Sequence, residues 1–131
     1  MENTAAQFEI KITLEEDFLL ISASGNYSLL KANNLFIVAI DNAVSQSRSK
    51  IFIDVTDIAG FISFFDRFRY AEFLSKYTEK HALGKVRRIA VVGKEPIVDK
   101  YRFGETVAIN RGTNVRVFTD MSQALIWINA K

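Results

Sequence analysis

The chain has 131 residues, the length of one ordinary domain with a single sizeable core. Apolar residues make up 49% and charged residues 24%, as in globular domains, which excludes a disordered chain. Cysteine is absent and histidine occurs once, which excludes a disulfide framework and a His/Cys metal cluster. No apolar run approaches the roughly 20 residues of a membrane span, and no leader pattern opens the chain. We therefore expect a cytoplasmic protein without an integral membrane segment.

The net charge of +2 is unevenly distributed along the chain. Residues 1–83 carry 8 basic and 11 acidic side chains, whereas residues 84–131 carry 9 basic and 4 acidic ones. The basic residues of the second part are dispersed over several expected elements, and no run of five or six like charges occurs. We therefore expect a solvated basic surface and no nucleic-acid partner.

The first part of the chain has the pattern of a hairpin followed by a helix. Residues 8–14 alternate between apolar and polar, which predicts a strand with one buried face. That face would contain Phe8, Ile10, Ile12 and Leu14. A polar break of three residues leads to a second strand over residues 18–24, and so short a loop makes the pair antiparallel. Apolar residues then recur at helical spacing through residues 28–47.

The remainder alternates short apolar strands with helices. We expect strands over residues 50–55, 86–92 and 115–118, helices over residues 66–82 and 97–110, and a last helix capped by Asp120. The buried face of the last helix would contain Leu125, Ile126, Trp127 and Ile128. This pattern predicts a single α/β domain over residues 1–131, with the order β-β-α-β-α-β-α-β-α. Its sheet would be mixed, mostly parallel, opened by an antiparallel hairpin and covered on both faces.

Three segments in this order carry a resemblance to a known family. They are IFIDVTDIAGF (residues 51–61), RRIAVVG (residues 87–93) and VRVFTDMSQALIWI (residues 115–128). The chain resembles the STAS domain, and more closely its branch similar to the sporulation stage II protein AA, which is sometimes grouped with the lipid-transfer CRAL-TRIO folds. The resemblance covers residues 8–130. It implies a mixed sheet surrounded by helices, and a protein-interaction or small-ligand module instead of an enzyme.

The same resemblance points to Ser63 as a candidate phosphate acceptor. In anti-sigma-factor antagonists the loop after the third strand leads into a D-S-[ST]-G segment, whose Ser is phosphorylated at a helix N-terminus. Ser63 aligns with that Ser, but Ile62, Phe64 and Phe65 replace its polar and small neighbours. A phosphate dianion beside these apolar rings would be energetically unfavourable. We therefore expect Ser63 to cap the helix and the phosphorylation switch to be absent.

Two carboxylates flank the predicted end of the third strand, where ligands gather in open α/β sheets. A phosphorylated Asp at such a place needs further carboxylates after the first strand to hold a metal ion. The acidic residues Glu15, Glu16 and Asp17 lie in the hairpin turn instead. We therefore expect Asp54 to order the loop, and Asp57 to belong to a partner or ligand surface.

Aromatic residues concentrate in residues 61–77, which contain seven of the 16 aromatic side chains (11 Phe, 4 Tyr and 1 Trp). These are Phe61, Phe64, Phe65, Phe68, Tyr70, Phe73 and Tyr77. Helical spacing predicts that Phe64, Phe68 and Ala71 face the sheet. Tyr70, Phe73 and Tyr77 would then form a separate patch, covered in part by a second copy of the chain. The alternatives are a lipophilic pocket, a membrane-surface face, or a core that accommodates all the rings, which would leave Arg67 and Arg69 as solvated charges.

We therefore expect a non-catalytic protein-interaction module that uses no cofactor and no metal. Its partner would be another protein or a second copy in a homodimer. The expected surface consists of Asp57, Phe61, Phe64, Phe65, Arg67, Tyr70, Phe73 and Tyr77. The alternative is a binder or carrier of a small apolar, lipid-like ligand, held in a pocket between the second helix and the sheet. An enzyme is disfavoured because no nucleophile, base and metal set assembles in the sequence.

Overall fold

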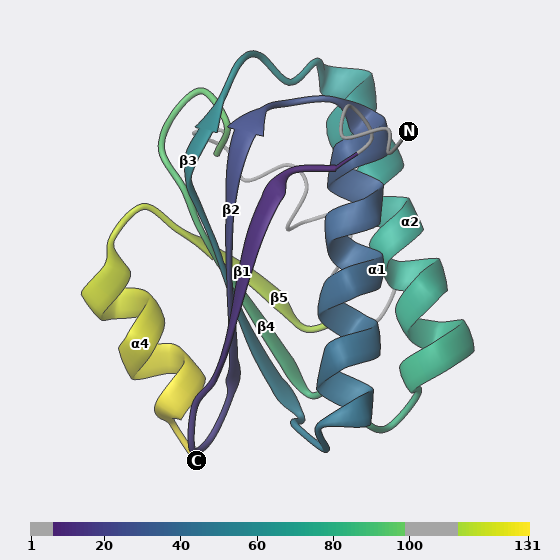
Figure 1. Ribbon diagram of the computed structural model, residues 1–131, viewed down its shortest axis with the longest axis vertical. Coiled ribbons are helices and arrows are strands. Elements are labelled where there is room, and N and C mark those ends of the chain that lie inside the picture. Colours follow the sequence, from purple (N-terminus) through teal and green to yellow (C-terminus); the bar gives the residue numbers. More distant parts are fainter. Residues whose placement is uncertain (1–6, 99–112) are drawn as a thin grey trace.

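A computed structural model describes residues 7–98 and 113–131 (Figure 1). Five strands form one mixed sheet in the spatial order β1-β2-β3-β4-β5. The strands are β1 (Glu9–Leu14), β2 (Leu19–Asn26), β3 (Lys50–Ala59), β4 (Arg88–Val92) and β5 (Val115–Phe118). The helices are α1 (Leu29–Ser45), α2 (Phe64–Ala82) and α4 (Met121–Asn129). The helix predicted over residues 97–110 lies almost entirely outside the described residues.

The pairing of the strands confirms the predicted fold class. β1 pairs with β2 antiparallel, and β2, β3, β4 and β5 then pair parallel to one another. β3 is longer than its apolar run predicts, because β2 continues to Asn26 and holds Asp57 to Ala59 in register. The predicted hairpin therefore opens a mostly parallel sheet.

Helices cover both faces of this sheet, so the core has two layers (Figure 1). On one face α1 packs on β2 and β3 and also contacts α2. The larger layer lies there and includes Ile21, Leu35 and Ile53. On the other face α4 buries Ile128 against Phe52 of the central strand. None of the described helices is long and apolar enough to cross a membrane.

Two predicted buried faces are only partly correct. Phe8, just before β1, is buried, but Ile12 and Leu14 within β1 are exposed, because β1 is the edge strand and α1 packs on β2 and β3 instead. In α4, Ile128 is buried together with Ala124, whereas Leu125 and Ile126 are exposed. Four consecutive helical residues span more than a full turn and cannot all face one sheet.

The ends of α4 are fixed by polar contacts. The carboxylate of Asp120, the predicted cap, accepts hydrogen bonds from the backbone N–H groups of Ser122 and Gln123 at 2.8 and 3.3 Å. The Ser122 hydroxyl also donates to this carboxylate, and that bond, together with the two backbone bonds, holds the pKa of Asp120 below its usual value. At the other end the Arg88 guanidinium donates to the carbonyl of Trp127 at 3.0 Å and also bonds that of Ala130. The strand β4 therefore anchors the C-terminal end of the helix.

Gly93, directly after β4, allows the side chains of Val98 and Val55 to lie unusually close to its backbone. A Cβ atom built on Gly93 would lie 2.6 Å from Cγ2 of Val98 and 3.0 Å from Cγ2 of Val55. These methyl groups belong to stiff, β-branched side chains that cannot turn aside. The glycine of the RRIAVVG segment is thus required by packing.

We expect Gly93→Ala to destabilise the protein by about 1–3 kcal/mol, the usual cost of overpacking a core. Thermal unfolding followed by circular dichroism measures this as a lower Tm. The double variant Gly93→Ala/Val98→Ala removes the nearest methyl groups and should lose less stability than the two single variants combined. Strict additivity would show that the close contact is not the cause.

Candidate functional site

The candidate site lies at the edge of the sheet where the parallel strands have their carboxyl ends. Ligand and partner sites of open α/β sheets gather at this edge. Gly60, with φ of 118°, turns the chain out of β3, a conformation that favours glycine. Residues 60–63 then lead into α2, which Figure 1 shows running beside α1 on the same face of the sheet.

Ser63 is the N-cap of α2, as predicted. Its backbone is extended (φ −68°, ψ 159°), and its Oγ accepts a hydrogen bond from the backbone N–H of Asp66 at 3.1 Å. This bond satisfies one of the N–H groups that a helix N-terminus leaves without an intrahelical partner. The cap also starts the helix at Phe64, two residues before the predicted boundary.

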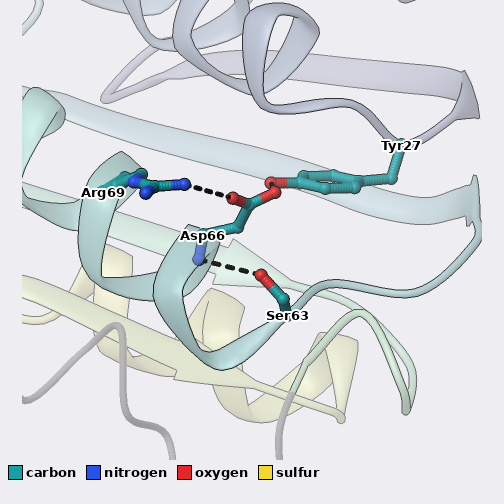
Figure 2. Close-up of polar contacts among 4 residues, drawn as sticks. All are labelled: Tyr27, Ser63, Asp66 and Arg69. Carbon is teal, nitrogen blue, oxygen red and sulfur yellow. Dashed lines mark hydrogen bonds and ion pairs between the residues drawn. The ribbon is translucent and has the colours of Figure 1, made fainter.

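Asp66 connects α2 to the end of β2 (Figure 2). The Tyr27 hydroxyl donates to Oδ2 of Asp66 at 2.9 Å, and Nη1 of Arg69 lies 3.5 Å from Oδ1. The backbone N–H of Tyr27 also donates to the carbonyl of Ala59 at 2.8 Å. The turn after β2, the end of β3 and the first turn of α2 are therefore joined.

Tyr27 is a site residue that the sequence reasoning missed. It is 39 residues from Asp66, so no local spacing marks the pair. Burial raises the pKa of the Tyr27 phenol well above its usual value, and the hydrogen bond to Asp66 raises it further. The phenol therefore keeps its proton and acts as a fixed hydrogen-bond donor.

Arg67 is buried. It was expected either in the partner surface or among the solvated charges, and both expectations are wrong. It is only 8% exposed. Its guanidinium donates to the carbonyl oxygens of Ile97, at 2.8 Å, and Pro96. A buried cation is tolerated when its donors are satisfied in this way. Arg67 thus fastens the first turn of α2 to the segment after β4.

The inward face of α2 differs from the predicted one. Its buried residues are Arg67, Ala71, Leu74, Ser75 and Ala82. Phe64 and Phe68, expected to face the sheet, are exposed, and Arg67 is the buried residue of the first turn. The prediction placed a phenylalanine where the chain uses an arginine.

Tyr70, Phe73 and Tyr77 also lie differently from the prediction. All three are partly buried and pack against the larger core layer. The Tyr70 ring lies 6.0 Å from the ring of Phe36 in α1, and the Tyr77 hydroxyl donates to Asp41 of α1 at 2.7 Å. That bond raises the pKa of Tyr77 to about 12. The contacts of Tyr70 and Tyr77 join the two helices. The patch that was predicted to contact a second copy is therefore largely covered by contacts within the chain.

Four phenylalanines around the start of α2 are exposed instead, and we call them the phenylalanine patch. They are Phe61 (76% exposed), Phe64 (61%), Phe65 (68%) and Phe68 (37%). The rings of Phe64 and Phe65 lie 5.8 Å apart and meet edge to face. The patch therefore places large apolar side chains in solvent at the carboxyl edge of the sheet.

The two candidate aspartates, Asp54 and Asp57, are not part of the phenylalanine patch. Oδ1 of Asp54 accepts hydrogen bonds from the backbone N–H and the hydroxyl of Thr56, at 2.9 and 2.7 Å. Asp54 and Thr56 both lie within β3, beside the register shift in its pairing with β2, so Asp54 orders the strand and not, as expected, the loop after it. Asp57 is exposed on β3, opposite Ser24. In the described part of the chain, no group of three or more His, Cys, Asp or Glu residues could hold a metal ion.

An apolar cavity of about 80 Å³ lies beneath α1 and α2. Its walls include Phe36, Ile53, Tyr70, Ala71 and Leu74. The location agrees with the pocket predicted between the second helix and the sheet. The volume is well below the roughly 300 Å³ at which small-molecule pockets begin.

The family assignment follows from the sequence comparison. The model of the SpoIIAA-like family matches residues 18–129. The chain belongs to the SpoIIAA-like family. The resemblance stated from the three strand and helix segments is thereby confirmed. No curated protein matches the sequence significantly.

Solved structures with a SpoIIAA-like architecture align over nearly the whole chain. An anti-sigma factor antagonist from Mycobacterium paratuberculosis aligns with a TM-score of 0.60 and 16% identity, covering 94% of this chain and 95% of its own. An uncharacterized protein with a SpoIIAA-like fold from Shewanella loihica PV-4 aligns with a TM-score of 0.54 and 21% identity, covering 98% of both chains. At these identities the likeness is one of fold.

The Tyr27–Asp66 bond can be tested by alkaline titration of the tyrosines. We expect the Asp66→Asn variant to lower the pKa of Tyr27, because the negative charge and strong acceptor are removed, while burial keeps the value above normal. Absorbance near 295 nm measures the phenolate, and the Tyr27→Phe variant identifies which step belongs to Tyr27. An unchanged titration in Asp66→Asn would contradict a pKa controlled by this bond.

Proposed function

We propose that this chain is a non-catalytic regulatory module that acts by binding protein through the phenylalanine patch. The observation that supports the proposal most directly is the exposure of Phe61, Phe64 and Phe65 at the carboxyl edge of the sheet. Aromatic side chains are enriched in the cores of protein interfaces, where each can contribute strongly to binding. The SpoIIAA-like fold supports a module of this type.

Three described polar residues near this edge are engaged in holding the structure. Asp54 bonds Thr56, Ser63 caps α2, and Asp66 accepts from Tyr27. A nucleophile or general base needs a free lone pair directed at a substrate and a partner that activates it. The bonds of these three residues serve the strand and the helix instead, which supports a non-catalytic role.

The surroundings of Ser63 support the absence of the phosphorylation switch. Its Oγ already lies at the helix N-terminus, 3.1 Å from the backbone N of Asp66. The carboxylate of Asp66 already supplies a negative charge in the first turn, where the helix dipole favours one. A phosphate on Ser63 would be repelled by that carboxylate, and the residues next to Ser63 in the chain, Ile62 and Phe64, carry no charge to pair with it.

A specific observation favours a second function, the carriage of an apolar ligand, because the cavity beneath α2 is lined almost wholly by apolar side chains. Its size argues against this function. An engineered apolar cavity of about 150 Å³ holds one benzene molecule, and this cavity has about 80 Å³. A lipid chain would require α2 to move away from the sheet, which would break the bonds of Arg67 and Asp66. We therefore rank carriage second.

We expect protein purified from its own cells to have the mass of the bare chain, both under native conditions and after denaturation. Phosphate on Ser63 at a substantial fraction would contradict a module without the switch. Retained ligand mass in the native spectrum, lost on denaturation, would favour carriage over protein binding. Protein expressed in an unrelated host is the control for phosphate or ligand acquired only in the original cells.

We expect chemical crosslinking in cells to trap the protein with a bound protein, and Phe61→Ser/Phe65→Ser to reduce the yield roughly tenfold or more. Both side chains are largely exposed, so the fold should survive their loss. Mass spectrometry of the crosslinked species identifies the partner, whether it is another protein or the same chain.

The matched control for this experiment is Leu83→Ser/Ile126→Ser. Leu83 is 77% exposed and Ile126 66% exposed, close to the values of Phe61 and Phe65, but both lie outside the patch. We expect this control to crosslink like the unmodified chain. No crosslinked species at all, or an equal loss in both double variants, would overturn the proposed function.

A further inference from the structure

We propose that the phenylalanine patch is the contact face of a two-fold homodimer, so that the partner of this surface is a second copy of the chain. This inference rests on the proposed function and names its partner. It also replaces the predicted dimer surface of Tyr70 and Phe73, which the structure packs against α1.

The area of the patch is the first argument. With ~200 Å² for each phenylalanine, the exposed fractions of the four rings correspond to about 500 Å² of apolar surface. The largest apolar patch on a typical monomer covers about 300–600 Å², and a standard interface takes about 800 Å² from each partner. The four rings would therefore supply more than half of one side of a stable dimer.

The charges beside the patch are the second argument. In the first two turns of α2 the charged residues are Asp66, Arg67 and Arg69. Arg67 is buried, and Arg69 lies 3.5 Å from Asp66, so the exposed charges nearly cancel. An anionic membrane would favour an excess of exposed cations here. In a two-fold dimer each surface contacts an identical one, so like charges would face each other. A nearly neutral surface avoids this repulsion.

The rigidity of the patch is the third argument. The cap at Ser63, the bond from Tyr27 to Asp66 and the bonds of Arg67 hold the first turn of α2 on three sides. Side chains on a fixed turn lose less conformational freedom when they become buried at an interface. The edge-to-face pair of Phe64 and Phe65 also leaves ring edges and faces that a copy of the same rings can meet in the same geometry.

Sedimentation velocity over a range of concentrations tests the homodimer. We expect the unmodified chain to be dimeric at tens of micromolar, and Phe61→Ser/Phe65→Ser to weaken the dimer by roughly 100-fold or more, since both copies lose their most exposed rings. Leu83→Ser/Ile126→Ser should dimerise like the unmodified chain. A second variant, Phe61→Glu, places a charge within the contact face of each copy and should also give monomers.

Thermal melts of every variant accompany these measurements, and we expect all of them to unfold cooperatively because the inward face of α2 is unchanged. An unmodified chain that is monomeric at 100 µM would overturn the homodimer. If the crosslinking experiment still traps a different protein through the patch, the proposed function stands without it. A dimer that survives both Phe61→Ser/Phe65→Ser and Phe61→Glu would overturn the assignment of this surface.

Discussion

The buried guanidinium of Arg67 determines which way the first turn of α2 faces, and the candidate surface depends on that orientation. A charged group leaves water at little net cost only where its donors find acceptors. The carbonyl oxygens of Pro96 and Ile97 provide them. With Arg67 inward, the helical period of 3.6 residues places Phe65 on the opposite side of α2, whereas Phe64, the first residue of the helix, and Phe68 are exposed beside Arg67. The two arginine–carbonyl hydrogen bonds thus fill the inward position of this turn with an arginine, and the phenylalanines expected in the core lie at the surface.

Two further contacts give the same turn a fixed position. Ser63 caps the helix, and the carboxylate of Asp66 accepts the Tyr27 hydroxyl from the end of β2 (Figure 2). Ser63 aligns with the Ser of the D-S-[ST]-G segment, but the chain does not keep the small, polar neighbours of that Ser. Here the polar groups fix the backbone and the side chains between them are apolar.

The sheet beneath this surface explains why the helix can be held so firmly. Gly93 lets the segment after β4 approach Val55, which brings Pro96 and Ile97 within reach of Arg67. On the inner side of α2, Ala71 and Leu74 pack toward the sheet and leave a cavity of about 80 Å³. α2 is held by its packing on α1 and by the hydrogen bonds of its first turn, which carries the exposed rings.

The sequence by itself determined the order of the elements, the antiparallel hairpin that opens a mostly parallel sheet, the family and the caps at Ser63 and Asp120. The order of the elements, the hairpin and the caps depend on short-range periodicity or on a residue two or three positions away, and the family depends on the resemblance of three segments; the sequence displays both directly. Only the tertiary structure decided the faces of α2 and α4, the Tyr27–Asp66 bond and the burial of Arg67. These depend on partners 29 to 39 residues away. Hydrophobicity alone assigned Phe64 and Phe68 to the core, because no local pattern reveals that distant carbonyl groups would satisfy an arginine there instead.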